Sequence, residues 1–154
     1  METNKNKWLA MLEHLPPCSG EEFQAADEKV CVVVRFEDRD RLGCLVREVI
    51  VTGPDGTPRM VDPVRAAETI TYLGEPLVLL ERDDPGRTAV LRSLPPRTTD
   101  EAIGYFELWT SPDRGTRLER FEYNRQTGER QAVPAAMTMD TLARLVDDLS
   151  RLIL

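Results

Sequence analysis

The chain has 154 residues, the usual size of one domain, and is long enough to bury a hydrophobic core without a metal or a disulfide. Hydrophobic residues make up 41% and charged residues 31%, and no apolar run approaches the ~20 residues of a membrane-spanning helix, which argues against a disordered or membrane-spanning protein. The net charge is −7, and basic residues alternate with acidic ones, so we predict no binding to nucleic acid.

The first segment predicts a helix. Trp8 and other apolar residues recur at helical spacing within residues 4–15, and the two prolines that follow end the pattern. Residues 18–28 are acidic and predict no more than a short helical turn through Phe23 and Ala26. This region has neither a continuous apolar stretch nor a small-residue cleavage site, so we expect no secretory signal and a cytoplasmic protein.

A β-hairpin is predicted next. Its first strand, Lys29–Glu37, is a β-branched run that is apolar on both faces, which favours a central strand covered on both sides. The charged residues 38–41 form the turn, and Leu42–Thr52 returns as the second strand. Two prolines and two glycines within residues 53–58 then predict a loop.

The middle of the chain allows two interpretations. Asp62 stands before a proline, as an N-cap residue does, and a short helix from there to Tyr72 is the preferred prediction. The β-leaning residues 69–72 favour instead a strand paired with residues 77–82. In either case residues 77–82 and 88–94 form a hairpin, because a Pro-Gly step between them has the geometry of a turn.

An aromatic hairpin over Ile103–Asn124 is the most distinctive stretch. It contains five of the nine aromatic residues of the chain, around the turn Ser111–Gly115. Four of the five form what we call the aromatic quartet: Tyr105, Trp109, Phe121 and Tyr123. A loop with an odd number of residues places the whole quartet on one face, whereas an even number replaces its first two members there by Phe106 and Leu108. We predict that the quartet is either core or a binding surface.

The last part of the chain predicts a short strand and a long helix. Residues 130–133 continue the hairpin, and Met139–Leu152 has an apolar stripe at helical spacing. Ion pairs at i,i+4 are expected on its other face, between Asp140 and Arg144, Arg144 and Asp148, and Asp147 and Arg151. The stripe continues through Ile153 and Leu154 and needs cover from the sheet or from a second copy. We therefore predict a homodimer through this C-terminal helix or through the aromatic hairpin.

Together these elements predict an α+β fold in one domain, residues 1–154. We expect an antiparallel sheet of about six to eight strands, built mostly from consecutive hairpins in a meander. Helices at the two ends of the chain flank this sheet.

The residues that most often carry chemistry are too dispersed to form a site. His14, Cys18, Cys31 and Cys44 are all possible zinc ligands, but the cysteines lack the close pairs of a structural zinc site. Their odd number predicts free thiols, with Cys31 and Cys44 buried in neighbouring strands. There is no nucleophile elbow and no phosphate-binding glycine loop. We predict no metal, no cofactor and no catalytic residue.

Carboxylates, which can carry general acid–base or divalent-metal chemistry, cluster at three places, and each cluster also has a structural explanation. The clusters are Glu37 with Asp38 and Asp40, Asp83 with Asp84, and Asp113 with Glu119 and Glu122. The first two lie at turns, where aspartate bonds to the backbone. The third lacks the lysine of a nuclease-like site, and Arg117 and Arg120 predict cross-strand ion pairs instead.

These observations favour a non-catalytic cytoplasmic protein that binds a protein partner, such as an adaptor, a chaperone or an immunity-type inhibitor. The alternative is a small-molecule-binding protein or a barrel-like enzyme domain, in which the aromatic residues line a cavity. An enclosed pocket with converging polar side chains favours the alternative. Packed aromatic side chains and an apolar outer patch favour partner binding.

Overall fold

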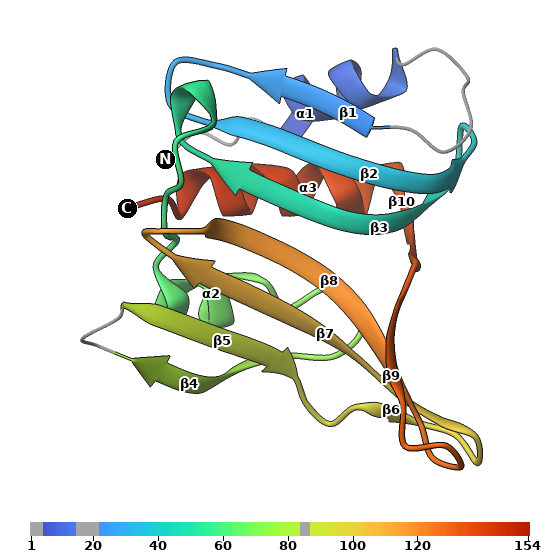
Figure 1. Cartoon of the computed structure of the whole chain (residues 1–154). Coiled ribbons are helices and arrows are strands. Elements are labelled where there is room, and N and C mark those ends of the chain that lie inside the picture. Colours follow the sequence, from blue (N-terminus) through green and yellow to red (C-terminus); the bar gives the residue numbers. More distant parts are fainter. Residues whose placement is uncertain (1–4, 15–21, 84–86) are drawn as a thin grey trace.

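A computed structural model describes residues 5–14, 22–83 and 87–154 of the chain (Figure 1). These residues form the predicted α+β fold, with one antiparallel sheet of ten strands in front of three helices. The helices are α1 (Lys5–Glu13), α2 (Pro63–Thr69) and α3 (Met139–Arg151), with a short 3-10 helix η1 (Pro54–Gly56). The strands are β1 (Glu22–Ala26), β2 (Cys31–Arg39), β3 (Gly43–Thr52), β4 (Leu77–Asp83), β5 (Thr88–Ser93), β6 (Arg97–Thr98), β7 (Ala102–Ser111), β8 (Gly115–Asn124), β9 (Arg130–Val133) and β10 (Ala135–Thr138).

The main path of the sheet contains seven strands, in the order β1-β2-β3-β8-β7-β5-β4. Most neighbours on this path are hairpin partners, as predicted, but β3 and β8 bring together two segments that are far apart in sequence. The strands β1 and β4 are the two ends of the path and do not pair with each other. The described part of the sheet is therefore open rather than a closed barrel.

The sheet forks between β3 and β8. These strands pair only over Glu48–Val51 of β3, and beyond that stretch they diverge (Figure 1). In the fork, the predicted strand β9 pairs with β8, and β10 pairs with β3. Pro134 stands between the two short strands. Because proline has no backbone N–H to give to a ladder, it suits the point where the chain changes partner.

The hydrophobic core lies between the sheet and the helices. Alternate residues of β2 point into it, and α1 and α3 supply the opposite surface. Almost completely buried aliphatic side chains come from all of these layers and include Leu12, Val32, Val34, Val49, Leu91, Leu108, Leu142, Leu145 and Leu149. Within the described residues, no helix has the length and apolar character needed to cross a membrane.

The C-terminal helix α3 is covered by its own chain. Its apolar stripe is buried in the core, Leu152 is buried as well, and Ile153 forms a β-bridge with Val61. Leu154 remains exposed. Two of the three predicted i,i+4 ion pairs form, at 4.0 Å for Arg144 with Asp148 and 3.5 Å for Arg151 with Asp147, whereas Asp140 pairs with Lys5 of α1 at 2.9 Å.

Two expectations in the first part of the chain are wrong. Residues 22–26 form strand β1 instead of a helical turn, because Phe23 and Ala25 alternate with exposed residues and fit the pairing with β2. The predicted strand at 29–37 exists as β2, but no described helix covers its second face, where Val33 is partly exposed.

The ambiguous middle segment is the helix α2. Asp62 Oδ1 accepts hydrogen bonds from the backbone N–H groups of Val64 and Arg65, and a proline occupies the first helical position. The helix ends at Thr69, so residues 69–72 do not form the alternative strand. The hairpin of β4 and β5 forms as predicted, although its turn at 84–86 lies outside the described residues.

Candidate functional site

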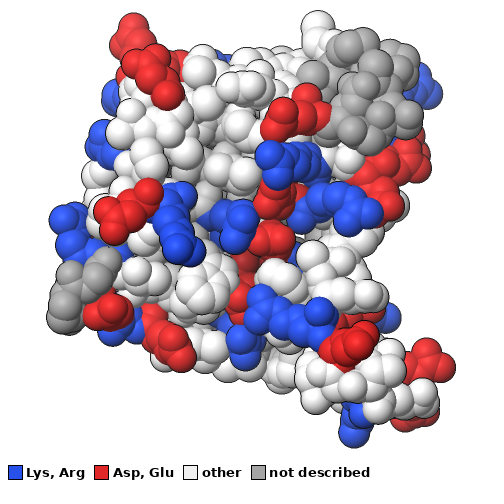
Figure 2. Space-filling view, viewed as in Figure 1, with Lys and Arg blue, Asp and Glu red and all other residues white. Residues whose placement is uncertain are grey.

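One face of the sheet carries no described helix, and we call it the open face. Successive residues of strand β7 lie on opposite faces of the sheet. Leu108 is part of the core, while its neighbours Glu107 and Trp109 lie on the open face. The open face is turned toward the reader in Figures 1 and 2. It is the face of the sheet that the described helices leave accessible to a ligand or a partner.

The aromatic quartet lies on this face. Ser111 pairs with Gly115, so the loop consists of residues 112–114, an odd number, and Tyr105 pairs with Phe121. Trp109 and Tyr123 are 42% and 41% exposed, Phe121 is half-buried, and Tyr105 is only 8% exposed. The quartet is thus divided into two accessible rings and two largely covered ones.

A row of charged residues crosses the open face at one level of the sheet. From β1 through β2, β3, β8 and β7 to β5, the residues in register are Glu22, Arg35, Glu48, Glu119, Glu107 and Arg92. The three central positions are all glutamates, on strands about 4.8 Å apart. Like charges directly opposite one another destabilise a sheet, so these carboxylates need cationic partners.

Glu107 is fully buried and is held by three side chains. Arg92 donates to Oε2 from Nε at 3.2 Å and from Nη2 at 2.9 Å, while Arg130 Nη2, at 3.0 Å, and Trp109 Nε1 donate to Oε1. Burial opposes the ionisation of Glu107, but the bonds from Trp109 and Arg92 and the charge of Arg130 outweigh it, so its pKa is lowered. Glu107 is therefore a carboxylate that fixes two arginines and the indole.

Glu48 and Glu119 are also paired with arginines. Arg35 Nη1 donates to Glu48, and Arg117 Nε lies 2.9 Å from Glu119 Oε1 and 4.0 Å from Glu48 Oε2. Burial raises the pKa of Glu119, the charge of Arg117 opposes this, and the negative Glu48 adds to the rise. The arginines therefore compensate the charge of Glu119 less well than that of Glu107.

The arginines form an outer layer above these carboxylates. We call Arg35, Arg92, Arg117 and Arg130 the guanidinium layer. Their side chains are 35–54% exposed, whereas the three glutamates are 0–18% exposed. Figure 2 shows the result as blue groups on both sides of a narrow red column. Since a guanidinium has five donors, pairing on its inner side leaves donors that face the solvent.

Two arginines of the layer also cover aromatic rings. The guanidinium of Arg130 lies 3.7 Å from the ring centre of Phe121, and that of Arg92 lies 4.6 Å from the ring centre of Tyr105. Both distances suit cation–π attraction. This explains why Tyr105 and Phe121 are less accessible than the other two members of the quartet.

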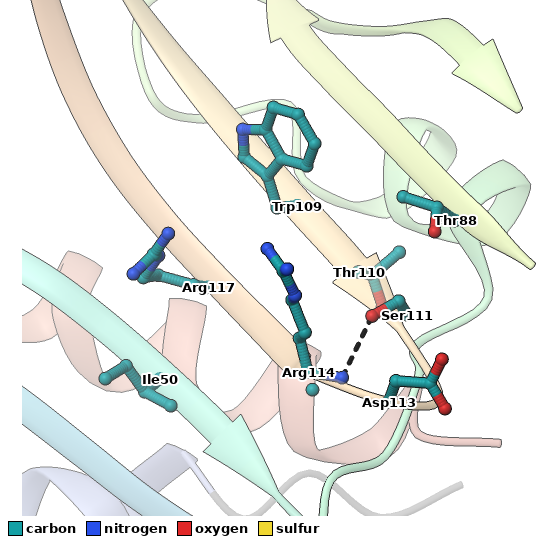
Figure 3. Close-up of a pocket in the computed structure, with 9 residues that line it drawn as sticks. Ile50, Thr88, Trp109, Thr110, Ser111, Asp113, Arg114 and Arg117 are labelled. Carbon is teal, nitrogen blue, oxygen red and sulfur yellow. Dashed lines mark hydrogen bonds between the residues drawn. The ribbon is translucent and has the colours of Figure 1, made fainter. Parts of the chain in front are cut away.

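A pocket of about 460 Å³ lies beside Trp109, at the turn end of the open face (Figure 3). Trp109 from β7, Arg117 from β8 and Arg114 from the turn line it, together with Ile50 of β3. The backbone N–H of Arg114 donates to Ser111 Oγ at 3.0 Å, and its side chain extends toward Trp109 and Arg117. Within the described residues, the Arg114 guanidinium makes no ion pair.

The predicted carboxylate clusters have mainly structural roles. Asp40 Oδ1 accepts from the backbone N–H groups of Leu42 and Gly43, as a turn residue does. Arg117 pairs across strands with Glu48, as predicted, and Arg120 Nη1 lies 3.4 Å from Glu75 Oε2. Asp84 lies outside the described residues.

The zinc ligands considered above are not brought together in the described structure. Cys31 and Cys44 are buried free thiols on the neighbouring strands β2 and β3, while Cys18 lies outside the described residues. Burial raises the pKa of Cys44 to about 11, and the negative Asp40 adds to the rise, so this thiol is not activated. Among the described residues, no group of three or more His, Cys, Asp or Glu is placed to hold a metal ion.

Sequence reasoning missed Glu107, although a signal was present. Glu107 is the only charged residue within β7, and both of its neighbours in sequence are apolar. A single carboxylate in such a strand needs buried partners, because an unpaired buried charge is very unfavourable. Its two arginine partners come from β5 and β9, which the local pattern does not reveal.

Comparisons of the chain with family models, with curated proteins and with solved structures find no match. The open face is therefore the main source of information on function.

Proposed function

We propose that the chain is a non-catalytic cytoplasmic protein whose partner, another protein, docks on the open face of the sheet. The observation that supports this most is Trp109, which is 42% exposed on a sheet face that no described helix covers. Tryptophan, tyrosine and arginine are the residue types most enriched in binding hot spots. The open face combines Trp109 and Tyr123 with the guanidinium layer.

The side chains of this face are held in place before any partner arrives. The indole of Trp109 is fixed through Nε1, and Arg92 and Arg130 are bound to the same carboxylate of Glu107. Side chains that are already ordered lose little entropy when they are covered, which favours affinity. A network of this kind is expected at a binding surface.

The guanidinium layer favours a different protein over a second copy of the chain. A two-fold dimer through the open face brings the same patch of both copies together, so arginines face arginines. A homodimer through α3 also has less support, because the apolar stripe of this helix and Leu152 are already buried within the chain. The competing proposal is therefore a homodimer, in which a second copy of the chain binds to the open face through the aromatic hairpin. Sedimentation of the full chain as a dimer that Trp109→Ser dissociates would favour it.

The alternative of a carrier or a barrel-like enzyme has less support. The sheet is open at β1 and β4, and the aromatic quartet lies on the open face instead of lining an enclosed cavity. Glu107, the most buried carboxylate there, has a lowered pKa and accepts hydrogen bonds from three side chains. It is thus poorly suited to donate a proton at neutral pH.

The proposal is tested by capture from a lysate of the source organism with the tagged full chain. We compare the wild type with Trp109→Ser and with Leu42→Ser, since Leu42 is 84% exposed at the turn between β2 and β3, away from the pocket. The expected result is a captured protein that Trp109→Ser loses and Leu42→Ser retains. Capture alone, without this difference, does not support the proposal.

A second variant on the open face tests whether the docking surface extends beyond Trp109. Ile50→Ser removes an apolar side chain from the same surface on a different strand, and thermal melting of each variant shows whether it is folded. If folded Trp109→Ser and Ile50→Ser both capture the same protein as the wild type, the partner binds elsewhere and the open face is not the docking surface.

A further inference from the structure

We propose that the pocket between Trp109, Arg114 and Arg117 receives an acidic segment of the partner protein. A carboxylate of that segment lies between the two guanidinium groups, and an adjacent apolar side chain packs on the indole. This inference rests on the proposed function and specifies the chemistry of the partner. It assigns a role to Arg114, which the network around Glu107 does not use.

The charged side chains that line this pocket are two arginines, Arg114 and Arg117, and one aspartate, Asp113, whose carboxylate points away from the Arg114 guanidinium (Figure 3), so the balance of charge favours an anion. Arg114 is exposed and makes no ion pair within the described residues, and its side chain extends toward Trp109 (Figure 3). Both ion pairs of Arg117 use its Nε atom, so the remaining donors of its guanidinium are available for another acceptor. Arginine binds carboxylates through paired, charge-assisted hydrogen bonds, which suits two guanidinium groups beside one pocket.

The apolar part of the pocket is in register with its charged part. Ile50 on β3 pairs with Arg117 on β8, which pairs with Trp109 on β7, so one row of the sheet places an arginine between two apolar side chains. A segment that alternates acidic and apolar residues matches this row. The local surface, and not the net charge of −7, then decides which partner the chain attracts.

The test uses a fluorescein-labelled peptide of alternating glutamate and leucine as the probe, with the full chain. Anisotropy is measured for the wild type, for Arg114→Glu, and for Arg65→Glu, which reverses an exposed arginine on α2 outside the pocket. We expect Arg114→Glu to weaken binding about tenfold and Arg65→Glu to leave it unchanged. Added salt should weaken binding by the wild type, because the contact is electrostatic.

The intrinsic fluorescence gives a second readout. The chain has two tryptophans, of which Trp8 is 2% exposed and Trp109 is 42% exposed. The probe should therefore change the emission of Trp109, and Trp109→Phe should remove that change. An emission change that persists in Trp109→Phe would place the probe away from the pocket and overturn the inference.

Three other probes complete the test. A lysine–leucine peptide should not bind, and a glutamate–serine peptide should bind more weakly because it lacks the apolar contact. A single-stranded DNA oligonucleotide should bind less tightly than the acidic peptide. Equal binding of the lysine peptide, tighter binding of the DNA, or no effect of Arg114→Glu would each overturn the inference.

The outcomes also separate this inference from the proposed function. If a lysate protein is captured through Trp109 and the acidic peptide does not bind, the protein-binding function stands and the acidic partner is wrong. If the peptide binds through Arg114 and no protein is captured through the open face, the pocket stands and the proposed function is wrong.

Discussion

Along β7, adjacent residues on the two faces of the sheet have opposite environments. Leu108 is fully buried and is flanked in register by Leu91 and Leu118, in a core of aliphatic side chains. Glu107, its neighbour in sequence, is equally buried but is surrounded by Arg92, Arg130 and Trp109. The same strand thus takes part in an apolar core on one side and in a charged network on the other.

Under the proposed function, this difference assigns stability mainly to the covered face and binding to the open face. An apolar core is non-directional, and its contribution follows the area that it removes from water. A buried charge network needs matched geometry, and desolvation offsets much of its attraction, so it contributes less to stability. Its presence on the exposed side of the sheet is better explained by the fixed positions that it gives to Trp109 and the guanidinium layer.

The largest expected effect is on the core side. Leu108→Ala should lower the free energy of unfolding by about 3 kcal/mol, because it leaves a cavity among well-packed aliphatic side chains. Urea denaturation measures this, with Leu42→Ala as a control, since Leu42 is mostly exposed and should change stability by less than about 0.5 kcal/mol. A similar loss in both variants would mean that the covered face is not the main source of stability.

The second largest loss of stability is expected when the charged network around Glu107 is disrupted. Glu107→Ala should destabilise the fold by about 2 kcal/mol, less than a fully buried ion pair would, because Arg92 and Arg130 are partly exposed and can turn to water. Glu107→Gln keeps the shape and part of the hydrogen bonding, so its loss should be smaller. Urea denaturation compares the three proteins. Wild-type stability in Glu107→Ala would show that other contacts hold the two arginines.

A smaller effect on stability, with a large effect on binding, is expected for Trp109. Trp109→Ser should cost about 1 kcal/mol, since the ring is partly exposed and loses one hydrogen bond to Glu107. Thermal melting and partner capture are measured on the same preparation. Loss of folding as severe as in Leu108→Ala would mean that Trp109 is a core residue, and the division between the faces would then be wrong.

The local sequence predicted much of the covered face. The valine-rich strand β2, the apolar stripe of α3 and the Asp62 cap of α2 are all short-range patterns, and the structure confirms them. Strand β1 was missed because only Phe23 and Ala25 mark it, and its state depends on pairing with β2. Short segments follow their tertiary partners more than their own propensity.

The open face was much less predictable. The aromatic quartet and its two registers were recognised, but the pairing of β3 with β8, which aligns Glu48 with Glu119, joins distant segments of the chain. Arg130 reaches Glu107 from β9 for the same reason. A site assembled from distant strands leaves no spacing pattern in the sequence, so only the three-dimensional structure brings its members together.

The smallest expected effect on stability is that of Glu119→Gln, which should stabilise the fold, whereas the other variants destabilise it. Burial and the negative Glu48 raise the pKa of Glu119 above the ordinary value of 4.5, against the charge of Arg117, so at neutral pH the folded state contains an unfavourable carboxylate. A raised folded pKa gives stability that is complete below the unfolded pKa and is lost as the pH rises through the folded pKa. Glu119→Gln should therefore stabilise the fold at neutral pH, by about 0.5 kcal/mol.

The pH dependence of stability distinguishes Glu119 from Glu107. The pKa of Glu107 is lowered in the folded state, so its stabilising contribution is lost as the pH falls through the folded pKa. Urea denaturation of the wild type and Glu119→Gln at neutral pH, and again below the ordinary glutamate pKa, gives the comparison. The advantage of the variant should disappear in acid, where Glu119 is protonated in both the folded and unfolded states. A variant that is less stable than the wild type at neutral pH would mean that the ion pair with Arg117 outweighs burial and the repulsion from Glu48. All three central carboxylates of the open face would then stabilise the sheet, and its charged network would be closer to a structural feature than to a binding surface.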